Sequence, residues 1–299
     1  MVREYVSNYF SRMKSAVAPY LFVLPTLTIL GVFMFYPLIQ NIYFSFFRFM
    51  AISPTKTFVG VHNFVKLVKD PVFWLSISNN IKILLGSVAI QVTLGFLLAN
   101  IIGVVLKRGR ALLRTIYFIP MVLSIVIVGL LWRFMYHPYF GLLNQGLEAI
   151  GLATLQRVWL GNPETAIYGI LAVCCWQWIG GCMVFFLGGL QGIPEALYEA
   201  AMIDGATRPQ CIWYITLPLL RKIIVVVTCF TMIGAFKVFD HIYVMTAGGP
   251  NHATEVLGTY LYLQAFTLDR MGYGTTIAIV LFLITFAASV VFLKLMELE

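Results

Sequence analysis

Charged residues are scarce in this chain of 299 residues, of which only 11% are charged and 61% are hydrophobic. Soluble domains contain about 45–50% apolar and about 25% charged residues, so this composition excludes a water-soluble globular fold. Acidic residues are the scarcest charged type, with 12 Asp and Glu against 20 Lys and Arg, and the net charge is +8. In so apolar a chain we attribute this charge to segments that flank membrane spans, and we expect no nucleic-acid partner.

Residue types that bind metals or carry out catalysis are equally few. The five cysteines and four histidines have no mutual spacing typical of a metal site, a disulfide framework or a catalytic triad. No G-x-x-x-x-G-K-[ST] segment is present, so the chain has no loop that could hold the phosphates of ATP. The short runs AGGP and IGG are interpreted as turn and helix-packing glycines. We therefore expect a chain that is not an enzyme and holds no metal and no cofactor of its own.

Long apolar runs are the dominant feature of the sequence. A bilayer core about 30 Å thick requires about 20 mostly apolar helical residues. Six segments meet this requirement, at about 18–46, 79–106, 115–136, 166–190, 222–246 and 274–296. The first run is too long for a cleaved signal peptide, and we expect it to remain as the first span. We predict an all-α polytopic membrane protein with six transmembrane helices, built as a single transmembrane domain over residues 1–299.

Basic residues in the short connections predict the orientation of the chain. The N-terminal tail, residues 1–17, carries Arg3, Arg12 and Lys14, and the turn KRGRALLR after the second span carries four more basic residues. Both segments fall on one side of the membrane if the spans alternate, and we predict that this side is the cytoplasm. Both termini and the loop 191–221 are then cytoplasmic.

A partly polar insert, EALYEAAMIDGATRPQCIWYITLP, lies at residues 195–218 between the fourth and fifth predicted spans. Pro194 suits the first position of a helix, and Glu195 suits the positively charged N-terminal end of that helix. Gly205 offers a break, and Pro218 marks the entry into the next span. The insert is either a short helix–turn–helix that docks in the cleft of a partner or an amphipathic connector on the membrane surface. These residues alone favour neither.

The same insert resembles the EAA loop of binding-protein-dependent ABC import permeases. The matching positions are Glu199, Ala200, Ala201, Asp204, Gly205, Ala206, Ile215, Leu217 and Pro218. Two positions depart from the family pattern, with Ile212 where Phe is usual and Lys222 where Pro is frequent. The resemblance implies the type I ABC importer permease fold, whose EAA loop forms coupling helices that sit in a groove of the ATPase subunit. The residues expected to couple to the ATPase are Glu195, Glu199, Ala200, Ala201, Asp204, Gly205 and Ala206.

Other segments are similar to carbohydrate permeases of the maltose-permease-like and glycerol-phosphate-permease-like groups. Examples are FVGVHNFVKLVKDPVFW and FKVFDHIYVMTAGGPNHATEVLGTYLYLQAF. The resemblance implies that the chain forms half of a pathway that imports a sugar or oligosaccharide, including an anionic one, across a bacterial inner membrane. It also implies three kinds of partner: a second permease chain in a heterodimer, two ATP-binding subunits that hold ATP and Mg²⁺, and an extracytoplasmic solute-binding protein.

The fourth predicted span contains one polar cluster, CCWQWIGGC. Polar residues inside membrane spans are costly and are functional candidates by default. Aromatic faces and amide groups suit the C–H surfaces and the hydroxyls of sugars, so we predict that Trp176 and Gln177 bind substrate. The alternative for the tryptophans is packing against lipid or a neighbouring helix, and Trp178 is left out of the predicted site on this ground.

The fifth predicted span contains GAFKVFDHIYVM. In the maltose-permease-like family the corresponding stretch contributes to the sugar site, which implies that Phe236, Lys237 and Asp240 bind substrate. Lys237 and Asp240 are three residues apart, so we predict that they share a helix face and pair, in the site or at the membrane boundary. This pair is also the only support for a rival function, an ion-coupled secondary transporter. Import of a non-sugar solute by the same ATP-driven machine is a further alternative.

Overall fold

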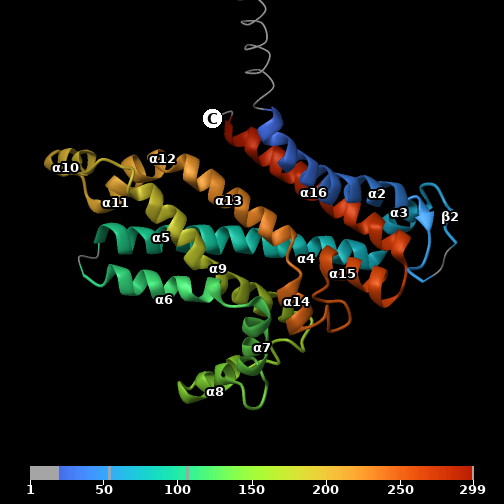
Figure 1. The fold of residues 1–299 in the computed structure, drawn as a ribbon. Coiled ribbons are helices and arrows are strands. Elements are labelled where there is room, and N and C mark those ends of the chain that lie inside the picture. Colours follow the sequence, from blue (N-terminus) through green and yellow to red (C-terminus); the bar gives the residue numbers. More distant parts are fainter. Residues whose placement is uncertain (1–19, 53–54, 106–107, 298–299) are drawn as a thin grey trace, which may run out of the picture.

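The computed structural model describes residues 20–52, 55–105 and 108–297, most of which are helical (Figure 1). The predicted N-terminal tail, residues 1–17, lies outside the described residues. The first helix, Tyr20–Phe44, contains a π-helical turn, η1 (Gly31–Phe35), and ends with α2 (Tyr36–Phe44). The other elements in chain order are β1 (Phe47–Arg48), β2 (Thr57–Phe58), α3 (His62–Val68), α4 (Pro71–Ser87), η2 (Val88–Val92), α5 (Thr93–Asn100), η3 (Ile101–Val105), α6 (Arg110–Val122), α7 (Ile125–Met135), α8 (Leu142–Ala149), η4 (Ala153–Leu155), α9 (Ala166–Leu190), α10 (Glu195–Ile203), α11 (Arg208–Cys211), η5 (Ile212–Thr216), α12 (Leu217–Leu219), α13 (Arg221–Phe236), α14 (Asp240–Met245), α15 (Leu257–Tyr262), η6 (Leu263–Thr267) and α16 (Met271–Glu297).

Four helices are long and apolar enough to cross a membrane. They are Tyr20–Phe44, Pro71–Gly103, Ala166–Leu190 and Met271–Lys294. There are up to six spans if each of two bent helix pairs counts as one: α6 meets α7 at 97°, and Arg208–Leu219 meets α13 at 72°. The segments predicted as spans over 115–136 and 222–246 are not continuous helices, because the first breaks after Val122 and α13 in the second ends at Phe236.

The break between α6 and α7 has a local cause. Pro120 lies inside α6 and has no backbone N–H, so the helical hydrogen-bond ladder loses one member there. Two residues later α6 ends, and Leu123 and Ser124 are extended, with ψ angles of 145° and 132°. The residues on both sides of the break are apolar, so hydropathy alone predicts one straight helix.

Helix α9 is the centre of the fold, and 67% of its most apolar window is buried. It packs against α4, α5, α6, α13 and α14. A Cβ atom added at Gly180 would lie 1.9 Å from the carbonyl oxygen of Tyr117, so only glycine allows α6 to pass this close. The interpretation of the IGG run as helix-packing glycines is confirmed.

The first helix and α16 lie side by side and run in opposite directions, so their described ends Tyr20 and Glu297 lie close together (Figure 1). None of the first helix's most apolar window is buried within the chain. At the other end of this helix pair, β1 and β2 form a short antiparallel ladder with Phe47 opposite Phe58. Within the described residues, these two strands are the β-structure of an otherwise helical fold.

Candidate functional site

The loop at residues 191–221 folds as two helices, α10 and the segment Arg208–Leu219, which contains α11, η5 and α12 (Figure 1). Among the predicted coupling residues, Glu195, Glu199, Ala200, Asp204 and Gly205 are exposed, and Ala201 and Ala206 are half-buried. Large apolar side chains in the loop are exposed as well, including Ile203 at 87% and Tyr214 at 80%. Exposed apolar groups of this kind mark interaction surfaces.

Three local features shape this loop. Gly205 has a φ angle of +84°, a left-handed conformation that ends α10 and that side chains disfavour. Thr207 and Gln210 form a capping box at the start of α11, with a 2.7 Å bond from the Thr207 amide. The hydroxyls of Tyr198 and Thr216 lie 2.9 Å apart and bond α10 to η5. The predicted helix–turn–helix is therefore present, and its second helix leads directly toward α13.

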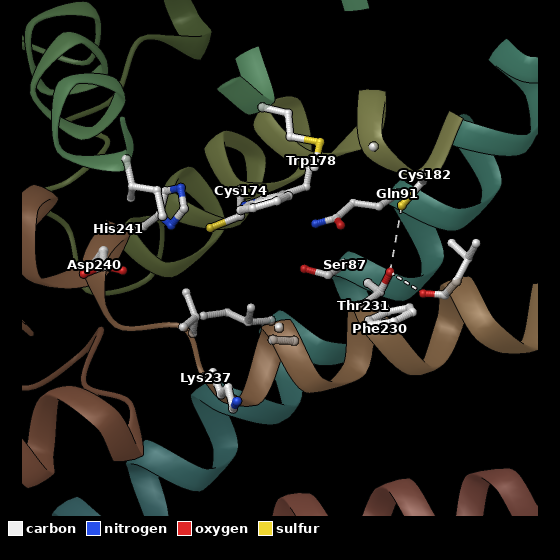
Figure 2. Close-up of a pocket in the computed structure, with 18 of the residues that line it drawn as sticks. Ser87, Gln91, Cys174, Trp178, Cys182, Phe230, Thr231, Lys237, Asp240 and His241 are labelled. Carbon is white, nitrogen blue, oxygen red and sulfur yellow. Dashed lines mark hydrogen bonds between the residues drawn. The ribbon is translucent and has the colours of Figure 1, made fainter. Parts of the chain in front are cut away.

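A cavity of about 410 Å³ lies between α4, α9, α13 and the segment that joins α13 to α14. Its volume falls in the range of about 300–1,000 Å³ typical of small-molecule sites. Its aromatic lining comes from Trp178, Phe185, Phe230 and Phe239, and its polar lining from Ser87, Gln91, Thr231, Lys237, Asp240 and His241. Figure 2 shows Ser87 and Gln91 directed from the α4–η2 helix into this space. A ligand with both apolar faces and hydrogen-bonding groups fits such a lining.

Lys237 and Asp240 both line the cavity, and both are exposed. They do not share a helix face, because α13 ends at Phe236 and α14 begins at Asp240. No ion pair joins the two side chains in the described structure, and they point in different directions in Figure 2. The predicted i,i+3 pair is wrong for this reason. Phe236 is buried and does not line the cavity.

The aromatic residues of α9 are placed differently from the prediction. Trp178 lines the cavity, whereas Trp176 packs edge-on against Trp132 with ring centroids 5.5 Å apart. Gln177 is fully buried behind the cavity wall. Its side chain bonds to His241 and to the carbonyl of Leu123, at 2.7 and 3.2 Å. The two tryptophans differ by about 200° around a helix, so only one of them can face the cavity, and the fold decides which.

The polar residues Ser87, Gln91, Thr231 and His241 line the cavity and were missed. Gln91 carried a usable signal, as an amide inside the apolar run SVAIQVTL. It lies in the π-helical turn η2, a distortion that is frequent at functional sites. His241 carried the same signal, as an ionisable residue in the predicted fifth span, but the sequence does not indicate its partner Gln177, which lies 64 residues earlier in the chain.

Two buried asparagines of α4 bond to the irregular backbone on either side of α14: Asn79 to the loop before α15, and Asn80 to the end of α13 and the start of α15. Asn79 donates hydrogen bonds of 2.8 and 2.9 Å to two carbonyls of the loop before α15. Asn80 donates to the last two carbonyls of α13 and accepts the amide of Leu257, the first residue of α15, at 2.9 Å. A helix end leaves polar backbone groups unpaired, which is expensive away from water. These amides therefore make the irregular segment that carries Lys237 and Asp240 tolerable inside an apolar bundle.

The sequence matches one protein family over residues 91–296, a range that includes most of the cavity lining and the whole 191–221 loop. That family is described as the binding-protein-dependent transport system inner membrane component. This chain belongs to that family. As a member, it is a membrane-embedded component of a transport system that works with a binding protein.

Several known permeases are similar to this family member along almost their whole length. The probable ABC transporter permease protein YurN of Bacillus subtilis (strain 168) is 40% identical over 282 residues, which are 94% of this chain and 96% of that protein. The trehalose/maltose transport system permease protein MalF of Thermococcus litoralis is 35% identical, with 96% and 97% covered.

A solved structure shares the fold. It is the crystal structure of a bacterial ABC transporter involved in the import of the acidic polysaccharide alginate. One of its chains superposes with a TM-score of 0.84 at 26% identity, covering 97% of this permease and 98% of that chain. The predicted type I ABC importer permease fold is confirmed.

Proposed function

We propose that this chain is the transmembrane subunit of an ATP-driven importer for a sugar or oligosaccharide, and that it forms half of the translocation pathway. The observation that carries the proposal is the near full-length similarity to a trehalose/maltose permease and to a chain of an alginate importer. The proposed substrates include anionic sugars, because alginate is named as acidic and the Lys237 ammonium, in a lining that also contains the Asp240 carboxylate, can pair with one carboxylate of a sugar.

The cavity between α4, α9 and α13 is the proposed site for one part of the sugar. Aromatic rings cover the apolar C–H faces of sugars, and amide, hydroxyl and charged groups bond their hydroxyls. Lys237 and Asp240 act there by direct contact. Gln177 and Phe236 act from behind the wall, and Trp176 acts through its packing on Trp132.

The 191–221 loop is the proposed docking element for the ATPase, which alone binds ATP and Mg²⁺. Closure of the ATPase subunits would push on α10, and η5 and α13 would pass the movement to the cavity. This chain performs no catalysis in the cycle. Its exposed Ile203 and Tyr214 then become buried against the ATPase.

The proposed assembly contains this chain, a second permease, two ATP-binding subunits and an extracytoplasmic solute-binding protein in a bacterial inner membrane. Both termini are proposed to be cytoplasmic. The antiparallel arrangement of the first helix and α16 supports termini on a single side (Figure 1). The basic turn between α5 and α6 supports the cytoplasm as that side.

Uptake and ATP hydrolysis by the reconstituted importer test the proposal. Wild-type complex is supplied with radiolabelled maltose, trehalose or an alginate trisaccharide, and amino acids serve as the non-sugar comparison. We expect uptake of at least one of these sugars.

Variants of the 191–221 loop test its coupling role in the same assay. We expect Asp204→Lys and Gly205→Pro to abolish uptake while the chain still inserts and ATP hydrolysis continues. Glu164→Lys, the same charge reversal at an exposed position outside the loop, is the control. Normal sugar uptake by both loop variants would remove the coupling role.

An ion-coupled secondary transporter is no longer supported by any specific observation, because its one argument was a Lys237–Asp240 pair. A non-sugar substrate for the same machine would be revealed by uptake of an amino acid in the experiment above. Failure of every sugar, with uptake of another solute, would contradict the substrate class and leave the ATP-driven mechanism in place.

A further inference from the structure

The hydrogen bonds around Gln177 determine which polar atoms it presents. Its Nε2 lies 3.2 Å from the carbonyl oxygen of Leu123, and its Oε1 lies 2.7 Å from Nε2 of His241. The reverse orientation would place two oxygen acceptors together at Leu123, so the amide nitrogen must face that carbonyl. Oε1 is then an acceptor, and Nε2 of His241 must be the donor.

This bond also determines the chemistry of the other ring nitrogen of His241. The two nitrogens are not equivalent, and the partner of one sets the role of the other. With its proton on Nε2, the neutral ring has an unshared electron pair at Nδ1 and can accept one hydrogen bond there. No described residue supplies that bond. Among the described residues, the Trp132 indole nitrogen is a fully enclosed side-chain atom without a hydrogen-bond partner, and Nδ1 of His241 is not such an enclosed atom.

His241 lines the cavity, although only 4% of its surface is exposed (Figure 2). Its Nε2 is occupied by Gln177, so Nδ1 is the polar atom that the ring can offer to a ligand. Gln177 also donates a hydrogen bond to the Leu123 carbonyl, which lies at the break between α6 and α7. Gln177 therefore ties three elements together at the cavity: α9, the α6–α7 break and α14.

We infer that His241 contacts the transported sugar through Nδ1, which accepts a hydrogen bond from a sugar hydroxyl, and that Gln177 is the positioning residue that holds the ring for this contact. The inference rests on the proposed function, since it requires a hydroxyl-bearing substrate in the cavity. It assigns Gln177 an indirect role in place of the direct sugar contact predicted from the sequence.

Two substitutions of His241 separate the sugar contact from a merely structural role. The amide of Asn reaches about as far as Nδ1, and the amide of Gln reaches about as far as Nε2. His241→Asn therefore keeps a polar group for the sugar and loses the bond to Gln177, whereas His241→Gln keeps that bond and loses the group for the sugar. A sugar-contacting role predicts the larger loss for His241→Gln, and a structural role predicts it for His241→Asn.

The readout is the KM for the sugar that the wild-type importer takes up from the panel of maltose, trehalose and alginate trisaccharide. We expect His241→Gln to raise KM about tenfold, the upper range for one neutral hydrogen bond, with a smaller change in kcat. His241→Asn is expected to raise KM less. His62→Gln changes an exposed histidine outside the cavity and serves as the control. A larger KM increase for His241→Asn than for His241→Gln would overturn the inference.

The role of Gln177 has its own test, which needs no substrate. Nitrogen-15 NMR of histidine-labelled full chain in lipid nanodiscs reports which nitrogen of His241 carries the proton, with the signal assigned by its loss in His241→Asn. We expect the Nε2–H form in wild type and a mixture of both forms in Gln177→Met, whose side chain has a similar length and no amide. The Nδ1–H form in wild type would overturn the inference. If the importer takes up none of the three sugars, the sugar assignment fails and this inference fails with it.

Discussion

The side chain of Asp70 makes hydrogen bonds to several helices of the fold. Its carboxylate caps α4 by accepting the amide of Val72 at 2.9 Å, and it also accepts the hydroxyls of Tyr260 and Tyr273. These tyrosines belong to α15 and α16, so one acidic residue links three helices. Burial alone would raise the pKa of Asp70, but these hydrogen bonds together hold it below its usual value of 3.8.

The pKa of Asp70 predicts a pH-dependent stability. A carboxyl whose pKa is lower in the folded state stabilises the protein above its unfolded pKa, and this contribution is lost as the pH falls through the folded value. At pH 7 we expect Asp70→Asn to lower stability by about 1.5–3 kcal/mol, the scale of a hydrogen bond to a charged group. The difference in apparent Tm between variant and wild type should shrink as the pH falls below 3.8. A difference that is the same from pH 7 to pH 3 would contradict the role of the charge.

At the scale of elements, the contact of α6 with α9 depends on Gly180. A methyl group there would meet the Tyr117 carbonyl oxygen at 1.9 Å, and a backbone atom cannot rotate away. We expect Gly180→Ala to cost about 1–3 kcal/mol and to lower the apparent Tm by several degrees. Gly188→Ala, on the same helix with no atom of the chain within 4 Å of the added carbon, is the matched control. Equal Tm values for both variants would show that the two helices do not pack this closely.

A hydrogen bond within the coupling loop supplies a second prediction at the element scale. The Tyr198 hydroxyl bonds to Thr216 at 2.9 Å and joins α10 to η5, so it is the side-chain link through which α10 can move the start of the fifth span. Tyr198→Phe should weaken this link by about 0.5–1.5 kcal/mol and reduce the sugar imported per ATP hydrolysed.

Tyr139→Phe removes the same hydroxyl from a tyrosine that is 88% exposed outside the 191–221 loop, and it should leave this ratio unchanged. Both variants should insert into the membrane like wild type. Loss of coupling in both, or in neither, would show that the Tyr198–Thr216 bond does not transmit the movement.

The spans and the polar insert could be predicted from the sequence, because hydrophobic length and helix-breaking residues are local properties. The bend between α6 and α7 and the bend before α13 could not be predicted in this way. Residues on both sides of Leu123 are apolar, and a proline such as Pro120 is tolerated in many membrane helices. The predicted helical pairing of Lys237 with Asp240 failed because α13 ends at Phe236. That end is stabilised by Asn80, which belongs to a helix far away in the sequence.

The cavity depends even more on long-range packing. Sequence patterns selected Trp176, Gln177, Phe236, Lys237 and Asp240, of which only the last two line it. The bond between Gln177 and His241 spans 64 positions of the sequence, and no periodicity in either helix implies it. Residue type identified α9, and the family resemblance implied the stretch from Phe236 to Asp240. The fold decided which side chains of these two segments line the cavity.

At the scale of the whole molecule, the chain has the character of one part of a larger assembly. None of the first helix's most apolar window is buried within the chain, and apolar residues are exposed at the 191–221 loop. Lipid can cover the first of these surfaces. The loop also exposes the charged side chains of Glu199 and Asp204, which suit a protein partner better than lipid tails.

Co-purification tests the central claim most directly, which is that this chain works as a permease driven by a separate ATPase through the 191–221 loop. The chain is extracted from its native membranes in a mild detergent, and the proteins that accompany it are identified by mass spectrometry. We predict an ATP-binding subunit and a second permease chain with the wild type. Recovery of the chain alone, under conditions that keep other membrane complexes intact, would contradict the account.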